Sequence, residues 1–248
     1  SDIGQYSFSN GKETTASGDN SHAEGEKTQA TNINCHAEGT FSIASGEASH
    51  AEGNWSSASG VYSHAEGSET TASGNYSHAE GNNTKASGES SHAEGNNTKA
   101  SGVYSHAEGM DTEAFVAGSH AEGWGTTASG VYSHTEGYFT KASSKAQHVQ
   151  GKYNIEDTEG KYAHIVGNGT DVDNRSNAHT LDWNGNAWFA GNVSIDGTPT
   201  NDKDLTTKKY VDDTVAAGKV AMCTDEEVND ILSSKLVVKE DNIFYKYP

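Results

Sequence analysis

A single histidine returns at every fourteenth residue through more than half of this 248-residue chain. The ten positions are His22, His36, His50, His64, His78, His92, His106, His120, His134 and His148. Phe8 occupies the same place in a shorter copy, so eleven copies run from residue 1 to about residue 151. A fixed period of this kind indicates stacked structural units, each of which buries its faces against its neighbours.

Each copy contains two shorter units of seven residues. Every seventh position from Gly4 to Gly151 is glycine in 19 of 22 cases, and the exceptions are Asn32, Val116 and Ser144. Small and larger residues alternate over five positions of each unit, which predicts a short strand followed by a two-residue turn. A helix is disfavoured, because glycine costs about 1 kcal/mol at each helical position. We expect the glycines at the corners, where a positive φ angle is often needed.

Alternation assigns the residues of each strand to two faces. Ser63, Ala65 and Gly67 share the inward face, whereas His64 and Glu66 share the opposite one. The chain therefore predicts a thin coil with two strands per turn and a core of alanine, serine, threonine and glycine. Only 32% of its residues are hydrophobic, and small methyl groups bury little area at about 25 cal/mol per Å². Such a coil needs a second buried surface.

Threonine also recurs, on the inward side of the companion strand. The positions are Thr14, Thr28, Thr70, Thr84, Thr98, Thr112, Thr126 and Thr140. A regular threonine array can suggest an ice-binding face, but these residues share their side with alanine and glycine, which favours a core role. The outward position of the same strand varies between Thr71, Lys85 and Glu113, as expected of a face in contact with solvent.

The pattern "NYSHAEGNNTKASG", residues 75–88, resembles the head repeat of YadA-like trimeric adhesins, whose usual core is "NSVAIG". The resemblance covers residues 1–151. It implies a left-handed parallel β-roll in which three chains lie side by side. His64 takes the valine place of that core and Glu66 the isoleucine place, so that an apolar subunit interface has become an ionisable one.

The histidine and glutamate positions scarcely vary, which suits a face packed against identical copies. Together with the resemblance, this predicts a homotrimer whose axis is lined by hydrogen-bonded imidazoles and carboxylates, because a buried carboxylate needs a partner. The predicted axial residues are the histidines from His22 to His134, with Glu24, Glu38, Glu52, Glu66, Glu80, Glu94, Glu108, Glu122 and Glu136.

Metal binding is the alternative for the same face. One imidazole from each of three chains could hold a divalent ion on the axis. The candidate positions are His64, His78, His92 and His106 with Glu66, Glu80, Glu94 and Glu108. Glutamate and histidine can satisfy each other's hydrogen bonds without a metal ion, which argues against this alternative. No resident cofactor is expected.

Aromatic residues recur near the corners between strands. Tyr62, Tyr76, Tyr104 and Tyr132 occupy one corner, whereas Phe41, Trp55 and Trp124 lie around the other. Aromatic side chains are common at interfaces and on sugar-binding surfaces. Packing over a neighbouring chain explains them equally well, and the sequence leaves both interpretations open.

The regular fourteen-residue spacing ends after residue 151. Residues 152–200 continue the roll with an insertion, and "LDWNGNAWF" predicts a β-hairpin turning at Asn184–Gly185. Its apolar residues, Trp183, Trp188 and Phe189, are expected to supply packing that the repeats lack. Residues 201–219 predict a helical neck or short coiled coil, and residues 220–248 a small α/β tip with a helix and a hairpin turning at Glu240–Asp241–Asn242. Parts of this region resemble phage tail-fibre and appendage proteins.

Charge and composition disfavour several classes of protein. The net charge is −19, from 35 acidic and 16 basic residues, which makes nucleic acid an unsuitable partner. No apolar run is long enough for a membrane span. Cys35 and Cys223 stand at unrelated positions, so neither a disulfide nor a zinc site is expected from them. The repeats offer many equal copies rather than one cleft with perturbed acids, so we do not expect an enzyme.

Attachment to a cell surface is the function that these features favour. The C-terminal resemblance indicates a phage or phage-derived tail fibre in the virion tail. Such a fibre would bind a glycan or protein receptor on the bacterial surface and contact other tail or baseplate proteins. The alternative is the head of a trimeric adhesin on the bacterial surface, and the third hypothesis is a polysaccharide depolymerase.

Overall fold

The computed structural model describes residues 3–194, 236–239 and 242–245. Residues 1–191 form one unit and residues 192–248 a second. Every regular element within the described residues is a β-strand. None of these residues forms a helix that is long and apolar enough to cross a membrane. The expected all-β class is therefore confirmed for this part of the chain.

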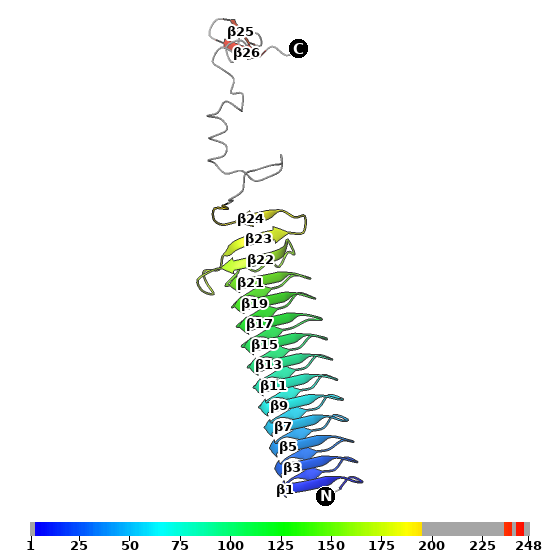
Figure 1. Ribbon diagram of the computed structural model, residues 1–248. Helices are drawn as coiled ribbons and strands as arrows, with labels where there is room; N and C mark the ends of the chain where they lie inside the picture. The colour runs from blue at the N-terminus through cyan, green and yellow to red at the C-terminus, as the bar shows by residue number, and fades with distance from the viewer. Residues whose placement is uncertain (1–2, 195–235, 240–241, 246–248) are drawn as a thin grey trace. The chain divides into compact units, whose positions relative to one another are not determined.

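Two parallel sheets build the repeats of the first unit (Figure 1). The wide strands are β1 (Phe8–Lys12), β3 (His22–Glu26), β5 (His36–Thr40), β7 (His50–Asn54), β9 (His64–Ser68), β11 (His78–Asn82), β13 (His92–Asn96), β15 (His106–Met110), β17 (His120–Trp124), β19 (His134–Tyr138) and β21 (His148–Lys152). The narrow strands are β2 (Thr15–Ala16), β4 (Gln29–Ala30), β6 (Ile43–Ala44), β8 (Ser57–Ala58), β10 (Thr71–Ala72), β12 (Lys85–Ala86), β14 (Lys99–Ala100), β16 (Glu113–Ala114), β18 (Thr127–Ala128) and β20 (Lys141–Ala142). Wide and narrow strands alternate along the chain, so each fourteen-residue copy makes one turn of a parallel β-solenoid.

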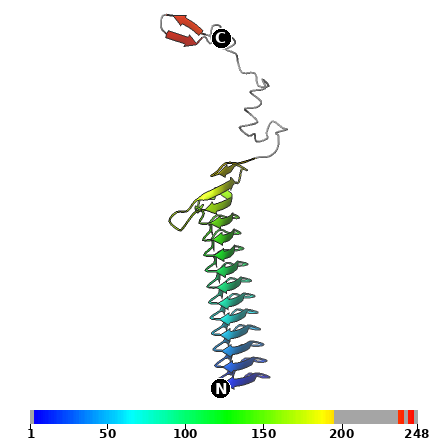
Figure 2. The ribbon, with the colours of Figure 1, turned by 60° about the vertical axis from the view of Figure 1, so that its left-hand side comes forward.

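Each turn lies in register on the next (Figure 2). His78 pairs with His92 and Glu80 pairs with Glu94 in the wide sheet. The narrow sheet follows the same rule, because Ala72 pairs with the alanine fourteen residues later. Equivalent residues therefore form columns along the solenoid, and whatever one turn places on a face is repeated by every other turn.

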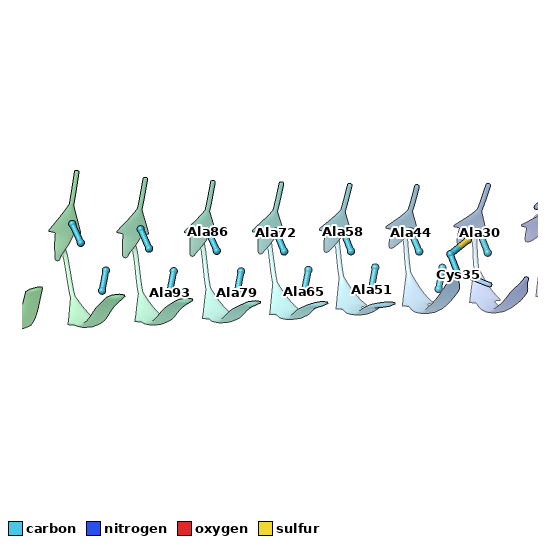
Figure 3. Packing of buried hydrophobic residues seen from close by; sticks show 14 of the residues in the cluster. Ala30, Cys35, Ala44, Ala51, Ala58, Ala65, Ala72, Ala79, Ala86 and Ala93 are labelled. Atoms are coloured by element: carbon cyan, nitrogen blue, oxygen red, sulfur yellow. The ribbon is translucent and has the colours of Figure 1, made fainter. Parts of the chain in front are cut away.

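Alanines from both sheets point toward one another across the inside of the coil (Figure 3). Ala65 of the wide sheet and Ala72 of the narrow sheet are completely buried. The hydroxyl of Ser63 is also buried and donates to the Gly60 carbonyl at 2.7 Å. The inward face predicted from alternation is therefore confirmed. The threonine column is buried as well, apart from the half-buried Thr14 in the first turn, which agrees with a core role.

Close approach of backbones, rather than corner geometry, explains the glycines. A Cβ atom at Gly74 would lie 1.9 Å from the carbonyl oxygen of Gly88 in the next turn. A Cβ at Gly81, which lies inside β11 with φ +107°, would lie 2.2 Å from the Gly95 carbonyl oxygen. At the corners, positive φ belongs instead to residues such as Tyr62, at 56°. The prediction of corner glycines is confirmed in part: glycines such as Gly74 lie in the bend that leads into a corner, whereas glycines such as Gly81 lie inside the wide strands. The turns stack closely at both places, and only Asn32, Val116 and Ser144 carry a side chain there.

The three non-glycine positions of the seven-residue rhythm share one adaptation. The amide N–H groups of Asn32, Val116 and Ser144 donate to Cys35 Sγ at 3.2 Å, Ser119 Oγ at 3.3 Å and Gln147 Oε1 at 3.4 Å. A glycine such as Gly60 donates instead to an alanine carbonyl in the next turn. Where a β-carbon is present, the side chain three residues later therefore accepts the amide.

Three further strands close the first unit. β22 (Tyr162–Asn168) pairs in parallel with β21, and His164 lies opposite His148, so the roll continues past the insertion as predicted. β22 then pairs antiparallel with β23 (Asn177–Asp182), which pairs antiparallel with β24 (Ala187–Phe189). The predicted hairpin is confirmed. Its turn is held by the Asp182 carboxylate, which accepts the amides of Asn184 and Asn186 at 2.8 Å each.

The apolar residues of this hairpin do not pack as expected. Trp183, Trp188 and Phe189 are each about half exposed, between 49% and 55%. The narrow sheet ends at β20, so the closing strands have no companion sheet behind them. The packing expected from the sequence is therefore not made among the residues that the structure describes.

Only a hairpin is described in the second unit. β25 (Leu236–Lys239) pairs antiparallel with β26 (Asn242–Tyr245). This agrees with the predicted hairpin, except that Asn242 begins the second strand instead of belonging to the turn. The neck expected at residues 201–219 and the helix expected after residue 220 lie outside the described residues. The domain boundaries at residues 151, 200 and 219 stay predictions.

Candidate functional site

The outward residues of the wide strands β3 to β21 form what we call the His–Glu ladder. Its ten imidazole rings, from His22 to His148, stack nearly face to face. Ring centroids of successive turns are 4.6–4.9 Å apart, and the ring planes lie within 16° of each other. This spacing follows from the separation of neighbouring strands, which is about 4.8 Å.

The glutamates form a second column beside the rings. Eight of the ten ladder histidines, all except His36 and His134, place Nε2 3.5–3.9 Å from a glutamate carboxylate oxygen. Glu66, for example, lies 3.8 Å from Nε2 of both His64 and His78. These separations exceed the usual length of a hydrogen bond. Within the described residues, the buried Nε2 atoms of all ten ladder histidines have no hydrogen-bond partner. One chain therefore does not satisfy its own ladder.

The pKa values of the glutamates alternate along the column. A hydrogen bond with Glu52 raises the pKa of Glu38 to about 7, and Glu80 raises the pKa of Glu66 to about 7 in the same way. The pKa values of Glu52 and Glu80 are lowered by these same bonds. The alternation continues with Glu94 and Glu122, whose pKa values are raised to about 7, and Glu108, whose pKa is lowered. Stacked carboxylates cannot all ionise, so protonated and ionised groups alternate.

Burial disfavours the protonated form of the ladder histidines. It lowers the pKa of His36, His50, His78 and His106, and neighbouring imidazoles add to the effect. The pKa of His120 is lowered to about 4 by the same causes. These rings are therefore neutral at neutral pH, and a neutral imidazole carries both a hydrogen-bond donor and an acceptor.

The structure gathers all the predicted axial residues on one face of the chain. It also adds His148, which belongs to the fourteen-residue series but was not among the predicted axial residues. Its ring stacks on His134, and its Nε2 lies 3.5 Å from Glu136. Gln150 then takes the glutamate place, 3.2 Å from His164, which ends the ladder. The position of the His–Glu ladder on a trimer axis stays a prediction.

Several parts of the ladder could also bind a metal ion. Groups of two histidines and one glutamate, such as His64, Glu66 and His78, place three possible ligand atoms within 4.8 Å of one another. All three atoms belong to one chain and come from two successive turns. This differs from the arrangement considered from the sequence, in which the imidazoles come from three chains.

The candidate surface aromatics do not form one continuous surface. Tyr62, Tyr76, Tyr104 and Tyr132 are exposed and have φ angles of 56–58°. Tyr62 stacks on Tyr76 at 5.4 Å, but Ser90 and Gly118 interrupt the column further along. Trp124, at the end of β17, packs edge-on against Tyr138 at 5.1 Å. Their role in binding stays a prediction.

A comparison with protein families identifies part of the repeat region. The model of the YadA head domain repeat matches two segments, residues 4–28 and 37–63. These repeats are similar to YadA heads. The match spans 25 and 27 residues, or 52 of the 248, and supports the resemblance inferred from "SHAEG" and its fourteen-residue period. A search of curated proteins returned no match.

Proposed function

We propose that this chain is the head of a trimeric, adhesin-type fibre that attaches to a surface outside the cell. Three copies would lie side by side with their His–Glu ladders facing a common axis. The match to YadA head repeats and the parallel β-solenoid support this proposal. The phage tail-fibre alternative is favoured only by sequence from the C-terminal region, much of which lies outside the described residues.

The unsatisfied ladder carries the proposal. Ten buried Nε2 atoms lack hydrogen-bond partners among the described residues, although the residues around them scarcely vary from turn to turn. Leaving a buried polar atom unpaired costs about 1–3 kcal/mol. Neutral imidazoles and protonated carboxyls of neighbouring copies could donate and accept across an axis, so that assembly would satisfy the whole column at once.

The small core supports the same conclusion. Among the described residues before Gln147, threonine is the largest side chain that is fully buried. Burial of apolar area provides about 25 cal/mol per Å², so a coil filled with alanine gains little stability by itself. Contact between copies would add a second buried surface, and the half-exposed Trp183, Trp188 and Phe189 would extend it at the end of the solenoid.

Analytical ultracentrifugation of the full chain tests the assembly. We expect a trimer at micromolar concentration. Replacing His78 with Val and Glu80 with Ile restores the apolar core of the YadA-like pattern at one turn and should keep the trimer. Replacing His78 with Asp adds a charge that has no partner on the axis and should weaken it. A stable, well-folded single chain would contradict the proposed assembly.

Binding experiments separate the possible targets. A fluorescently labelled full chain is applied to immobilised extracellular-matrix proteins, to animal cells and to a panel of bacterial cells. Retention on matrix or animal cells supports an adhesin, whereas retention on bacterial cells alone supports a tail fibre. New reducing ends after incubation with bacterial polysaccharides would instead indicate a depolymerase and overturn the proposal.

A further inference from the structure

Each turn of the ladder offers one unpaired nitrogen and one carboxylate. The Nε2 atoms of His64 and His78 are buried and unpartnered among the described residues, and both lie 3.8 Å from the Glu66 carboxylate. Their rings are parallel within 6° and 4.8 Å apart. His64 faces Oε2 of the Glu66 carboxylate and His78 faces Oε1. One ligand atom from each of the three residues lies within 4.8 Å of the others, held by strands β9 and β11, which are paired over five residues.

This donor set suits divalent transition metals. Zinc binds histidine nitrogen at about 2.0–2.1 Å and carboxylate oxygen at about 2.0–2.2 Å, so two ligands of a tetrahedral ion stand roughly 3.4 Å apart. The nitrogen-to-oxygen distances of 3.5–3.9 Å along the ladder already approach that value. Rotation of the two imidazoles toward the carboxylate between them brings the three ligand atoms together, and water can complete the coordination.

We propose that the ladder is a metal-binding array in which each Zn²⁺ ion is held by two histidines of successive turns and the glutamate between them. All three ligands come from one chain, so the site forms without the proposed trimer, and a bound ion takes the Nε2 lone pair that could otherwise accept a hydrogen bond across the trimer axis. A bound cation also offsets the repulsion between stacked carboxylates. The same donors suit Ni²⁺ and Co²⁺, and Zn²⁺ is the probe for the test.

Geometry sets the number of ions. A neutral imidazole offers one lone pair, so one Nε2 serves one ion, and two groups that share a histidine cannot be filled together. Ten histidines at two per ion give at most five ions per chain. Full occupancy pairs His22 with His36, His50 with His64, and so on to His134 with His148. The group of His64, Glu66 and His78 is then an alternative that fills only when its neighbours are empty. Beyond β21 the array stops, because Gln150 replaces glutamate and lies against His164.

Two variants with the same number of substitutions test this arrangement. The alternating variant replaces every second ladder histidine with Asn, at His22, His50, His78, His106 and His134. The block variant makes the same change at His22, His36, His50, His64 and His78. The alternating variant leaves no two neighbouring histidines, whereas the block variant leaves five in succession, enough for two ions.

Bound Zn²⁺ is counted by equilibrium dialysis and atomic absorption, after removal of metal with a chelator. We expect about five ions per chain for the unaltered protein, none for the alternating variant and two for the block variant. Cys35 and Cys223 are present in all three proteins, so they do not affect the difference. Equal binding by both variants, or no tight binding by the unaltered chain, would overturn the proposal. About one ion per turn of a trimer would also overturn it, because such ions would bridge chains.

A single substitution provides the same test if a variant with five substitutions does not fold. His78→Asn leaves four complete pairs and one unpaired histidine, so the count should fall from five to four. Circular dichroism checks that the strands are retained. An unchanged count of five would contradict the pairing of neighbouring turns.

Discussion

The repeat region, residues 8–146, and the end region, residues 147–191, satisfy their backbones in different ways. In the repeat region each turn donates to the next, and the side chains inside are alanine, serine and threonine. In the end region, individual polar side chains hold an irregular backbone. Asn154 binds both the amide and the carbonyl of Lys141, and the Asp157 carboxylate accepts the amides of Lys161 and Tyr162.

This difference shows what repetition permits and what it requires. Copying a turn satisfies every backbone group without special side chains, but only small residues fit where the turns stack. Once the copying stops, larger residues such as Val149 and Ile165 enter the core, and buried Gln147 and Asn154 replace the missing contacts. The repeat region should therefore be sensitive to added atoms, and the end region to lost hydrogen bonds.

Adding one carbon to the repeat region should have the largest effect. In Gly81→Ala the new Cβ would lie 2.2 Å from the Gly95 carbonyl oxygen, on a backbone with φ +107°, and that oxygen cannot move without shifting a whole turn. We expect a loss of at least about 3 kcal/mol in the free energy of unfolding, measured by urea denaturation at one protein concentration. Gly191→Ala is the control, because no atom lies within 4 Å of its new Cβ. Similar losses for both variants would contradict the explanation by stacking.

Removing one side chain from the end region should have the second-largest effect on stability. Gln147 is fully buried; its amide nitrogen donates to Asp157 and to the Tyr162 carbonyl, both at 3.0 Å. Gln147→Ala leaves these groups unsatisfied and should cost about 2–3 kcal/mol in unfolding free energy. Gln150→Ala, on the outward face, should cost much less under the same denaturant titration. If the two variants lose equal amounts of unfolding free energy, specific side chains do not hold the end region.

The sequence predicted the fold where contacts repeat a local pattern. Alternation of period two placed Ala65 inside and His64 outside, and the fourteen-residue period predicted the columns. The role of the glycines was not predictable in this way, because it depends on the distance between turns. Gln147 was also missed, since the two acceptors of its amide nitrogen lie ten and fifteen residues away and do not belong to the repeated pattern.

The sequence predicted the residues of the candidate site but not their detailed contacts. Its residues and their common face follow from alternation, and the period includes His148. The unpaired Nε2 atoms and the alternating pKa values of Glu38 and Glu52 do not follow, because both depend on the separation of stacked side chains.

The pH dependence of stability should show the repulsion that stacking creates. The pKa values of Glu38, Glu66, Glu94 and Glu122 are raised to about 7. Their stabilising contribution is therefore complete below about pH 4.5 and is lost as the pH rises through 7. Replacing all four with Gln should make the protein more stable than the unaltered chain at pH 8 and leave it similar at pH 4. Thermal unfolding with a chelator present measures this difference.

The opposite set of glutamates provides the control. The pKa values of Glu52, Glu80 and Glu108 are lowered, so their contribution is present above about pH 4.5 and is lost as the pH falls below it. Replacing these three with Gln should lower stability at pH 8. The end region has Gln150 in the glutamate place and should not contribute to either change. If both sets shift stability in the same direction, the carboxyls do not alternate.

The smallest expected effect concerns two threonine hydroxyls, one in the middle of the repeat region and one near its end. The buried hydroxyl of Thr98 has no hydrogen-bond partner among the described residues, whereas the hydroxyl of Thr140 bonds to Thr135 at 2.7 Å and to the Glu136 carbonyl at 3.0 Å. Thr98→Val removes an unsatisfied polar atom at nearly constant volume, so it should leave stability unchanged or raise it by up to about 1 kcal/mol. Thr140→Val removes two hydrogen bonds and should lower stability by about 1 kcal/mol in the same urea titration. Opposite signs at two equivalent positions would show that identical neighbouring copies leave the Thr98 hydroxyl unsatisfied, whereas a changed neighbour provides a partner, as Ser56 does for Thr70 and Thr135 does for Thr140.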